Sequence, residues 1–106
     1  MQKRYQVKVA RRADIMLLSH TEFLAQVSSM AARKLLAEYK KTVSQIADDP
    51  YRFPYADELD APGIPLETYR KCTFYRRYKA LFLVDGSDVH IDAIIDCRQE
   101  NKGLFR

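Results

Sequence analysis

The C-terminal third of the chain, residues 69–106, has the sequence YRKCTFYRRYKALFLVDGSDVHIDAIIDCRQENKGLFR. Three runs rich in β-branched and aromatic residues, at 69–75, 78–84 and 89–97, predict three short strands. Arg76-Arg77 falls at the first turn, and Asp85-Gly86-Ser87-Asp88 between the second and third runs is a strong hairpin signal. We therefore expect an antiparallel three-stranded meander.

Alternation along these strands predicts which side chains share a face of the sheet. One face should lie beneath helices and hold Val89, Ile91, Ala93, Ile95 and Cys97 from the last strand, with Ala80, Phe82 and Val84 from the strand before it. The other, open face should hold His90, Asp92, Ile94, Asp96 and Arg98, with Lys79, Leu81 and Leu83. Lys79 and Arg98 are then expected to face one groove, and either Arg70 or Lys71 adds a further cation to it or to its rim.

The N-terminal half predicts a strand followed by two helices. Tyr5, Val7 and Val9 alternate with polar residues, which is the period of a strand with one buried face. From residue 10 to 27 the apolar residues recur at helical spacing, at Ala13, Met16, Leu17, Leu24 and Val27.

A second helix follows almost without a loop, so the two helices are expected to form an antiparallel hairpin. Ser28 or Ser29 can cap it, and Asp49-Pro50 should end it because proline disfavours the helical conformation of the residue before it. Its apolar stripe comprises Ala32, Leu35, Leu36, Tyr39, Val43 and Ile46. The opposite side, which holds Arg33, Lys34, Lys40, Lys41 and Gln45, is interpreted as a solvated face.

The segment 50–65 is rich in proline and acidic residues and is expected to be a surface loop. Tyr51, Phe53 and Tyr55 should fasten it to the core through their rings.

At 106 residues the chain has room for one domain, expected to span 1–106. It has no long apolar run and no signal-like N-terminus, so a cytoplasmic protein is expected. Cys72 and Cys97 are interpreted as packing residues and His20 as structural, and neither a metal site nor a cofactor is expected.

The net charge of +4 is unevenly distributed. Residues 1–12 carry five basic and no acidic groups, residues 13–68 five basic and nine acidic, and residues 69–106 eight basic and five acidic. If both ends of the chain meet in one sheet, this segregation builds a positive surface for a polyanion, although a plain solvated surface is an equal alternative.

The residue types exclude most hydrolytic mechanisms, because no Ser-His-Asp arrangement, paired carboxylates or metal cluster is evident. A basic sheet face can still hold RNA. Cleavage of RNA by its own 2′-hydroxyl needs the phosphate gripped, the hydroxyl deprotonated and the developing charge neutralised. Arginine suits the last task because its planar donors bind phosphate oxygens bidentately, whereas lysine acts as a point charge.

The predicted element order and several short motifs resemble the RelE/ParE superfamily of type II toxin–antitoxin toxins. The motifs are Asp49-Pro-x-x-Phe-Pro, Tyr69-Arg-Lys, the run from Arg77 to Gly86 and Ile95-Asp96-Cys97-Arg98-Gln99-Glu100. The resemblance covers nearly the whole chain. It implies an α+β fold with a compact antiparallel sheet and the helical hairpin on one face, and it implies a cognate antitoxin that blocks the toxin.

In the RelE branch such toxins act at the ribosome and cut mRNA. The resemblance implies that Arg98, Lys79 and Arg70 are catalytic, and that Lys71, Arg76, Arg77 and Lys102 bind RNA. Two positions depart from the pattern, because Cys72 stands where a second basic residue is expected and Phe105, at the C-terminal aromatic position, cannot transfer a proton. Tyr75, Tyr78 and Lys79 are the remaining candidates for a base.

These departures leave two alternatives to the endoribonuclease. One is a ParE-like protein that inhibits DNA gyrase by binding it. The other is an inactive toxin-fold protein that only binds its antitoxin.

Overall fold

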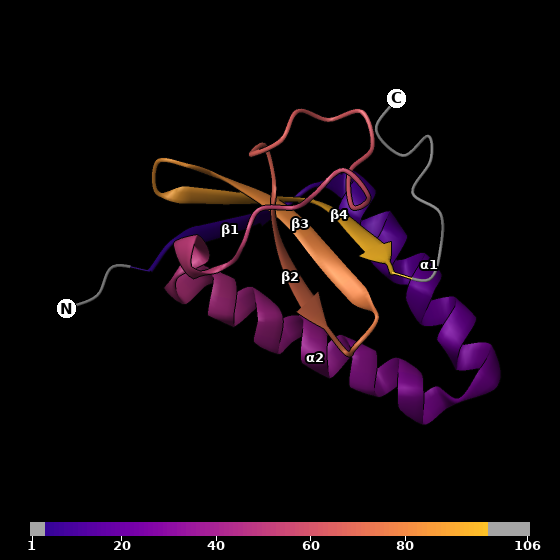
Figure 1. The fold of residues 1–106 in the computed structure, drawn as a ribbon. Helices are drawn as coiled ribbons and strands as arrows, with labels where there is room; N and C mark the ends of the chain where they lie inside the picture. Colours follow the sequence, from indigo (N-terminus) through magenta and orange to yellow (C-terminus); the bar gives the residue numbers. More distant parts are fainter. Residues whose placement is uncertain (1–3, 98–106) are drawn as a thin grey trace.

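A computed structural model describes residues 4–97 of the chain. Its elements follow the order β1 (Gln6–Val9), α1 (Arg11–Val27), α2 (Ser29–Asp48), the 3₁₀ turn η1 (Pro50–Arg52), β2 (Arg70–Phe74), β3 (Tyr78–Asp85) and β4 (Asp88–Asp96). The expected strand, helical hairpin and three-stranded meander are therefore all present (Figure 1).

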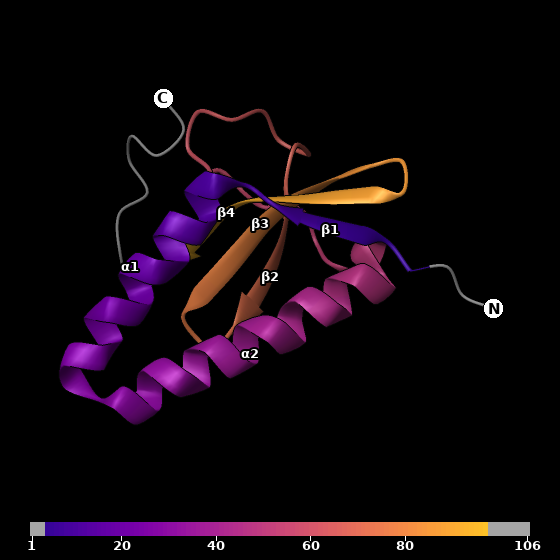
Figure 2. The same ribbon diagram turned by 180° about the vertical axis from the view of Figure 1, so that it is seen from behind.

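The four strands form one mixed sheet in the order β1-β4-β3-β2. β2, β3 and β4 pair antiparallel as a meander, while β1 pairs parallel with β4. Both helices lie on one face of this sheet, with α1 against β4 and α2 against β1 and β2 (Figure 2). The α+β fold class is confirmed.

The two helices meet at Ser28, whose side chain accepts a hydrogen bond from the backbone N–H of Ala31 at 3.1 Å. This residue ends α1 and caps α2, as expected. The predicted burial is wrong for two members of the apolar stripes, because Val27 is 79% exposed and Leu36 is 39% exposed. The helices diverge from their junction (Figure 2), and the core is filled by a narrower set of side chains.

The main core lies between the helices and the sheet. It joins Ala13 and Leu17 of α1 and Leu35 and Ile46 of α2 to side chains of the strands, namely Cys72, Phe74, Tyr78, Ala80, Phe82, Val89, Ile91 and Ile94.

The face prediction for β4 fails halfway along the strand. Leu81 pairs with Ala93 and Phe82 with Ile91, so Asp92 is an extra residue that forms a β-bulge. Val89 and Ile91 lie beneath the helices as expected, but beyond the bulge the alternation is inverted. Ala93 and Ile95 therefore lie on the opposite face, while Ile94 lies in the main core.

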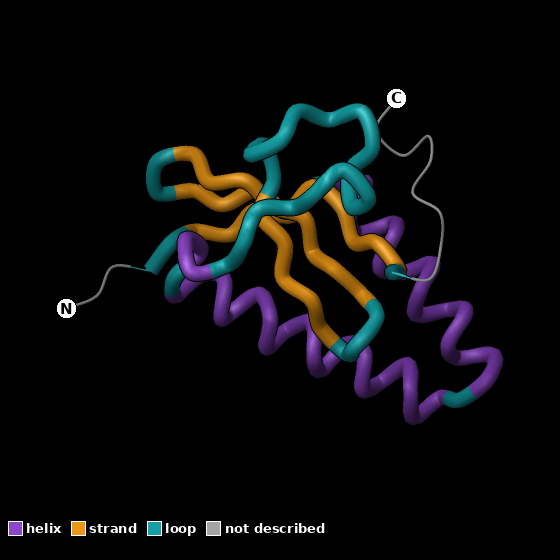
Figure 3. Tube along the Cα trace, in the orientation of Figure 1, coloured by secondary structure: helices purple, strands orange, loops and turns teal. Residues whose placement is uncertain are grey.

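The sheet face away from the helices is not open. The loop of residues 53–69 crosses it (Figure 3), and Ala56 and Ala61 pack there against Leu81, Ala93 and Ile95 in a second, smaller core. The ends of the loop are held by backbone hydrogen bonds, from Ala56 N–H to the Tyr69 carbonyl at 2.7 Å and from Lys71 N–H to the Pro54 carbonyl at 2.9 Å.

Candidate functional site

Lys71 and Lys79 lie side by side on the sheet face that the loop covers, and both bind one carboxylate. Lys71 Nζ lies 2.8 Å from Asp60 Oδ2, and Lys79 Nζ lies 2.5 Å from Asp60 Oδ1. Asp57 lies 3.5 Å from Lys71 and adds a second, weaker pairing. Lys79 thus has the predicted facing, but the predicted groove is filled by the loop and the charge of Lys79 is neutralised within the protein.

The Asp60 side chain is almost fully buried. Burial by itself would raise its pKa, but the hydrogen bonds from Lys71 and Lys79 outweigh that effect and lower the pKa to about 2. The same contact with Asp60 raises the pKa of Lys71. Asp60 and Lys71 are therefore both charged at neutral pH, and the contacts of Asp60 with Lys71 and Lys79 fasten the loop to the sheet.

Arg77 is also neutralised by a buried carboxylate. It hydrogen-bonds Asp96 through both Nε and an Nη, and Asp96 is only 2% exposed. The guanidinium also lies over the ring of Tyr78, 5.0 Å from its centroid. Asp96 was expected on the open face, but it pairs with Tyr78 of the main core because of the bulge at Asp92.

Arg70 is held among aromatic groups. Its guanidinium donates to the Phe53 carbonyl at 2.7 Å and to the Tyr55 hydroxyl at 3.2 Å, and it lies 4.2 Å from the Tyr55 ring centroid. Tyr51 and Tyr55 are 54% and 44% exposed, so only Phe53 fastens this loop to the core as expected. Tyr51, Tyr55 and Arg70 border a cavity of about 120 Å³, which is also lined by Glu67, Thr68, Leu83 and Val84.

Arg76 projects into solvent from the turn between β2 and β3. Tyr75 and Arg76 both have positive φ angles, +49° and +65°, a conformation that costs a non-glycine residue of order 1 kcal/mol or more. Arg77 follows directly and is fixed by Asp96, so the strained turn is anchored at one side.

Arg98 and Lys102 lie outside the described residues. Their assigned roles remain predictions. Within the described part of β4 the predicted alternation holds only as far as Asp92, because Ile94 and Asp96, expected on the open face, belong to the helix side.

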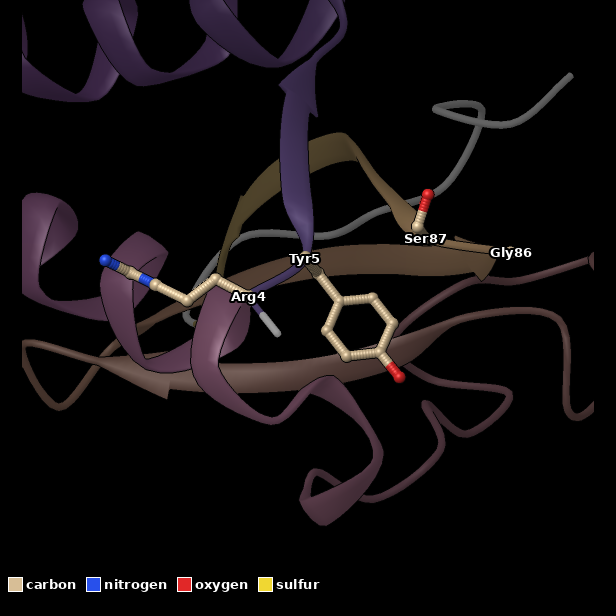
Figure 4. Close-up of a pocket in the computed structure, with 4 residues that line it drawn as sticks. All are labelled: Arg4, Tyr5, Gly86 and Ser87. Atoms are coloured by element: carbon tan, nitrogen blue, oxygen red, sulfur yellow. The ribbon is translucent and has the colours of Figure 1, made fainter. Parts of the chain in front are cut away.

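A larger cavity of about 320 Å³ adjoins the N-terminal end of β1 and the β3–β4 turn (Figure 4). Arg4, Tyr5, Gly86 and Ser87 line it. The Arg4 side chain points away from Tyr5 in Figure 4 and binds Asp48 at 3.0 Å and Ser44 on α2. The charge at this cavity is thereby used to hold α2 against the strand.

The remaining chemically notable residues have structural contacts. His20 Nε2 lies 2.8 Å from the Ile94 carbonyl, and its ring lies against Tyr78. Cys72 is buried in the main core, and Cys97 is exposed. Within residues 4–97, no group of three His, Cys, Asp or Glu side chains is placed to hold a metal ion. Neither helix of the described region has the length and apolarity needed to cross a membrane.

Sequence reasoning missed the two buried carboxylates, Asp60 and Asp96. Both lie in segments whose charge suggested solvent exposure, one in an acidic loop and one at an alternating strand position. A weak indication that Asp60 is buried was present in the sequence. Ala56 and Ala61, on either side of it, have small apolar side chains that can pack on a sheet.

No protein-family model and no curated protein sequence matches the chain. Among solved structures, the fold is similar to a chain of the chromosomal ParDE toxin–antitoxin (TA) system from P. aeruginosa, with a TM-score of 0.66 and 19% sequence identity. The similarity covers 89% of this chain and 97% of that one. The chain therefore shares its fold with that chain of the ParDE system.

Proposed function

We propose that residues 1–106 form one toxin domain of a type II toxin–antitoxin pair, held inactive by a cognate antitoxin. The observation that carries this proposal is the fold, which is similar to a chain of a ParDE system over nearly the whole length of both chains. The motif order from Asp49 to Glu100 supports the same family.

For the mode of action, we infer binding to a macromolecular target, with DNA gyrase as the candidate. A ribonuclease site must present cations to the phosphate whose charge develops in the reaction. Lys71, Lys79 and Arg77, three of the predicted cations, instead neutralise buried carboxylates of the protein itself. Using them on RNA would withdraw a cationic counter-charge from the buried carboxylate of Asp60 or Asp96.

The ribosome-dependent mRNA endoribonuclease remains the second candidate because two predicted cations are not used in this way. Arg70 and Arg76 pair with no carboxylate within residues 4–97, and both lie near the surface. Together with Arg98 and Lys102 they form the cation set that such an enzyme would use.

Brief expression in a bacterial host, with and without the cognate antitoxin, tests the proposal. We expect growth arrest that the antitoxin relieves. In the same cells, lost plasmid supercoiling and double-strand breaks with intact messages indicate gyrase inhibition, whereas codon-phased cuts in translated mRNA indicate the ribonuclease. Normal growth with tight antitoxin binding indicates the inactive homologue and contradicts the toxin assignment.

A further inference from the structure

The outer side of α2 carries four cations on one face. Arg33 and Lys40 are seven residues apart, as are Lys34 and Lys41, so each pair lies two helical turns apart along one line. All four side chains are exposed. We call these four residues the α2 basic face. It extends about 12 Å along the helix axis.

Within residues 4–97, no ion pair neutralises the charges of the α2 basic face. None of the four residues forms an ion pair with a carboxylate in the part of the chain that the structure describes, and Arg33 donates to the neutral Ser29 hydroxyl at 3.5 Å. Glu38, on the same helix, pairs with neither Lys34 nor Lys41. By contrast, three lysines of the sheet, Lys8, Lys71 and Lys79, bind aspartates, as does Arg77 in the β2–β3 turn.

The face is also held rigidly. The opposite side of α2 is buried through Ala32, Leu35, Thr42, Ile46 and Ala47, and Ser28 caps its N-terminus. The positions of the four Cα atoms are therefore fixed before any partner binds, so docking orders only the side chains.

We propose that the α2 basic face docks on the phosphate backbone of a nucleic acid. One strand of a duplex carries a phosphate about every 3.4 Å along its axis, so three or four phosphates lie along the length of this face. A membrane surface fits less well, because an interfacial helix inserts its apolar side and that side of α2 is buried in the core.

This inference adds a second contact surface to the proposed function and rests on that function only for its biological setting. Ribosomal RNA and gyrase-bound DNA both present phosphate backbones, so the surface serves either candidate target. Unlike Lys71, Arg77 and Lys79, these four can bind a partner without withdrawing a counter-charge from a buried carboxylate.

The test measures binding of the full chain to two fluorescent probes, a 20-nucleotide single-stranded RNA and a 20-base-pair DNA duplex, between 50 and 200 mM KCl. The variant is Lys40→Gln/Lys41→Gln. The matched control, Lys8→Gln/Arg11→Gln, removes the same net charge from β1 and α1. For the variant we expect the slope of log K against log salt to fall by about 1.8 on the duplex and about 1.4 on single-stranded RNA, with the control near wild type.

For the wild-type protein, four phosphate contacts predict that duplex affinity falls about 150-fold over this fourfold salt range. For the variant, the two contacts that remain predict a fall of about 12-fold. Equal slopes in the variant and the control would overturn the proposal, because only net charge would then matter. An absence of binding to both probes at 50 mM KCl would also overturn the proposal. Equally tight binding to a polyglutamate peptide, measured in the same way, would overturn it too, because it would indicate an acidic protein partner. None of these readouts requires the protein to be toxic.

Discussion

Asp60 determines whether the lysines on the sheet face that the sequence predicts as a site are available to a ligand. Its carboxylate sits between two lysine ammonium groups beneath a loop, so charges that look available in the sequence are used inside the fold. The distribution of cations along a chain therefore says little about which of them can reach a ligand.

Replacing Asp60 tests this account, and we expect Asp60→Asn to lower the free energy of unfolding by about 2–3 kcal/mol. The amide keeps the shape but removes the carboxylate that pairs with Lys79 and leaves Lys71 with only the more distant Asp57. Urea denaturation at pH 7 measures the loss. Glu67→Gln, an exposed change of the same charge in the same loop, should stay within about 0.5 kcal/mol of wild type.

The Asp60 carboxylate should also make the free energy of unfolding decrease at acidic pH. Its pKa is about 2 in the folded protein against 3.8 ordinarily, so its contribution is complete above about pH 4 and is lost as the pH falls towards 2. The stability gap between wild type and Asp60→Asn should therefore narrow by about 2 kcal/mol from pH 5 to pH 2. A gap that stays constant in urea titrations across this range contradicts the ionic account.

Arg98 remains the predicted working residue of the nuclease candidate. If that candidate is right, Arg98→Ala should abolish growth arrest while the far-ultraviolet circular dichroism spectrum and thermal midpoint stay unchanged. Arg11→Ala, at an exposed position on α1, serves as the control and should remain toxic. Full toxicity of the Arg98→Ala protein removes Arg98 from the site.

β4 shows what a strand pattern can and cannot predict. Its existence and pairing follow from its composition and from the Asp85-Gly86 turn. Its faces do not, because a single extra residue at Asp92 inverts the alternation beyond it. The bulge is held by tertiary partners, as Tyr69 donates to the Asp92 carboxylate at 2.8 Å and Arg12 to its carbonyl at 3.0 Å. Neither partner is near Asp92 in sequence.

The β2–β3 turn should be stabilised by removing its strain. At position 76, where φ is +65°, Arg76→Gly should raise the free energy of unfolding by about 1 kcal/mol relative to Arg76→Ala. Both variants lose the same charge, so the comparison isolates the backbone. If Arg76 binds the target, both variants should lose activity although their free energies of unfolding differ. Equal stabilities of the two variants would mean that the turn relaxes without cost.

For the molecule as a whole, the element order, the helix boundaries and the placement of the helices on one face were predictable from local patterns. Period, caps and turn residues are short-range signals, and Ser28 and Pro50 marked the ends of α2 correctly. The candidate site was not predictable to the same degree. It depends on a loop that returns over the sheet and on contacts such as Lys79 with Asp60, which are set by packing rather than by spacing.

The parallel pairing of β1 with β4 joins Gln6 to Asp88 and Val9 to Ile91, across some eighty intervening residues. Contacts between such distant parts of a chain form slowly, because a long segment must be ordered before they can be made. During synthesis β1 emerges first and can acquire its neighbour only after β4 has been translated. The sheet therefore cannot be completed, and the folded form cannot act, until the residues of β4 have been translated.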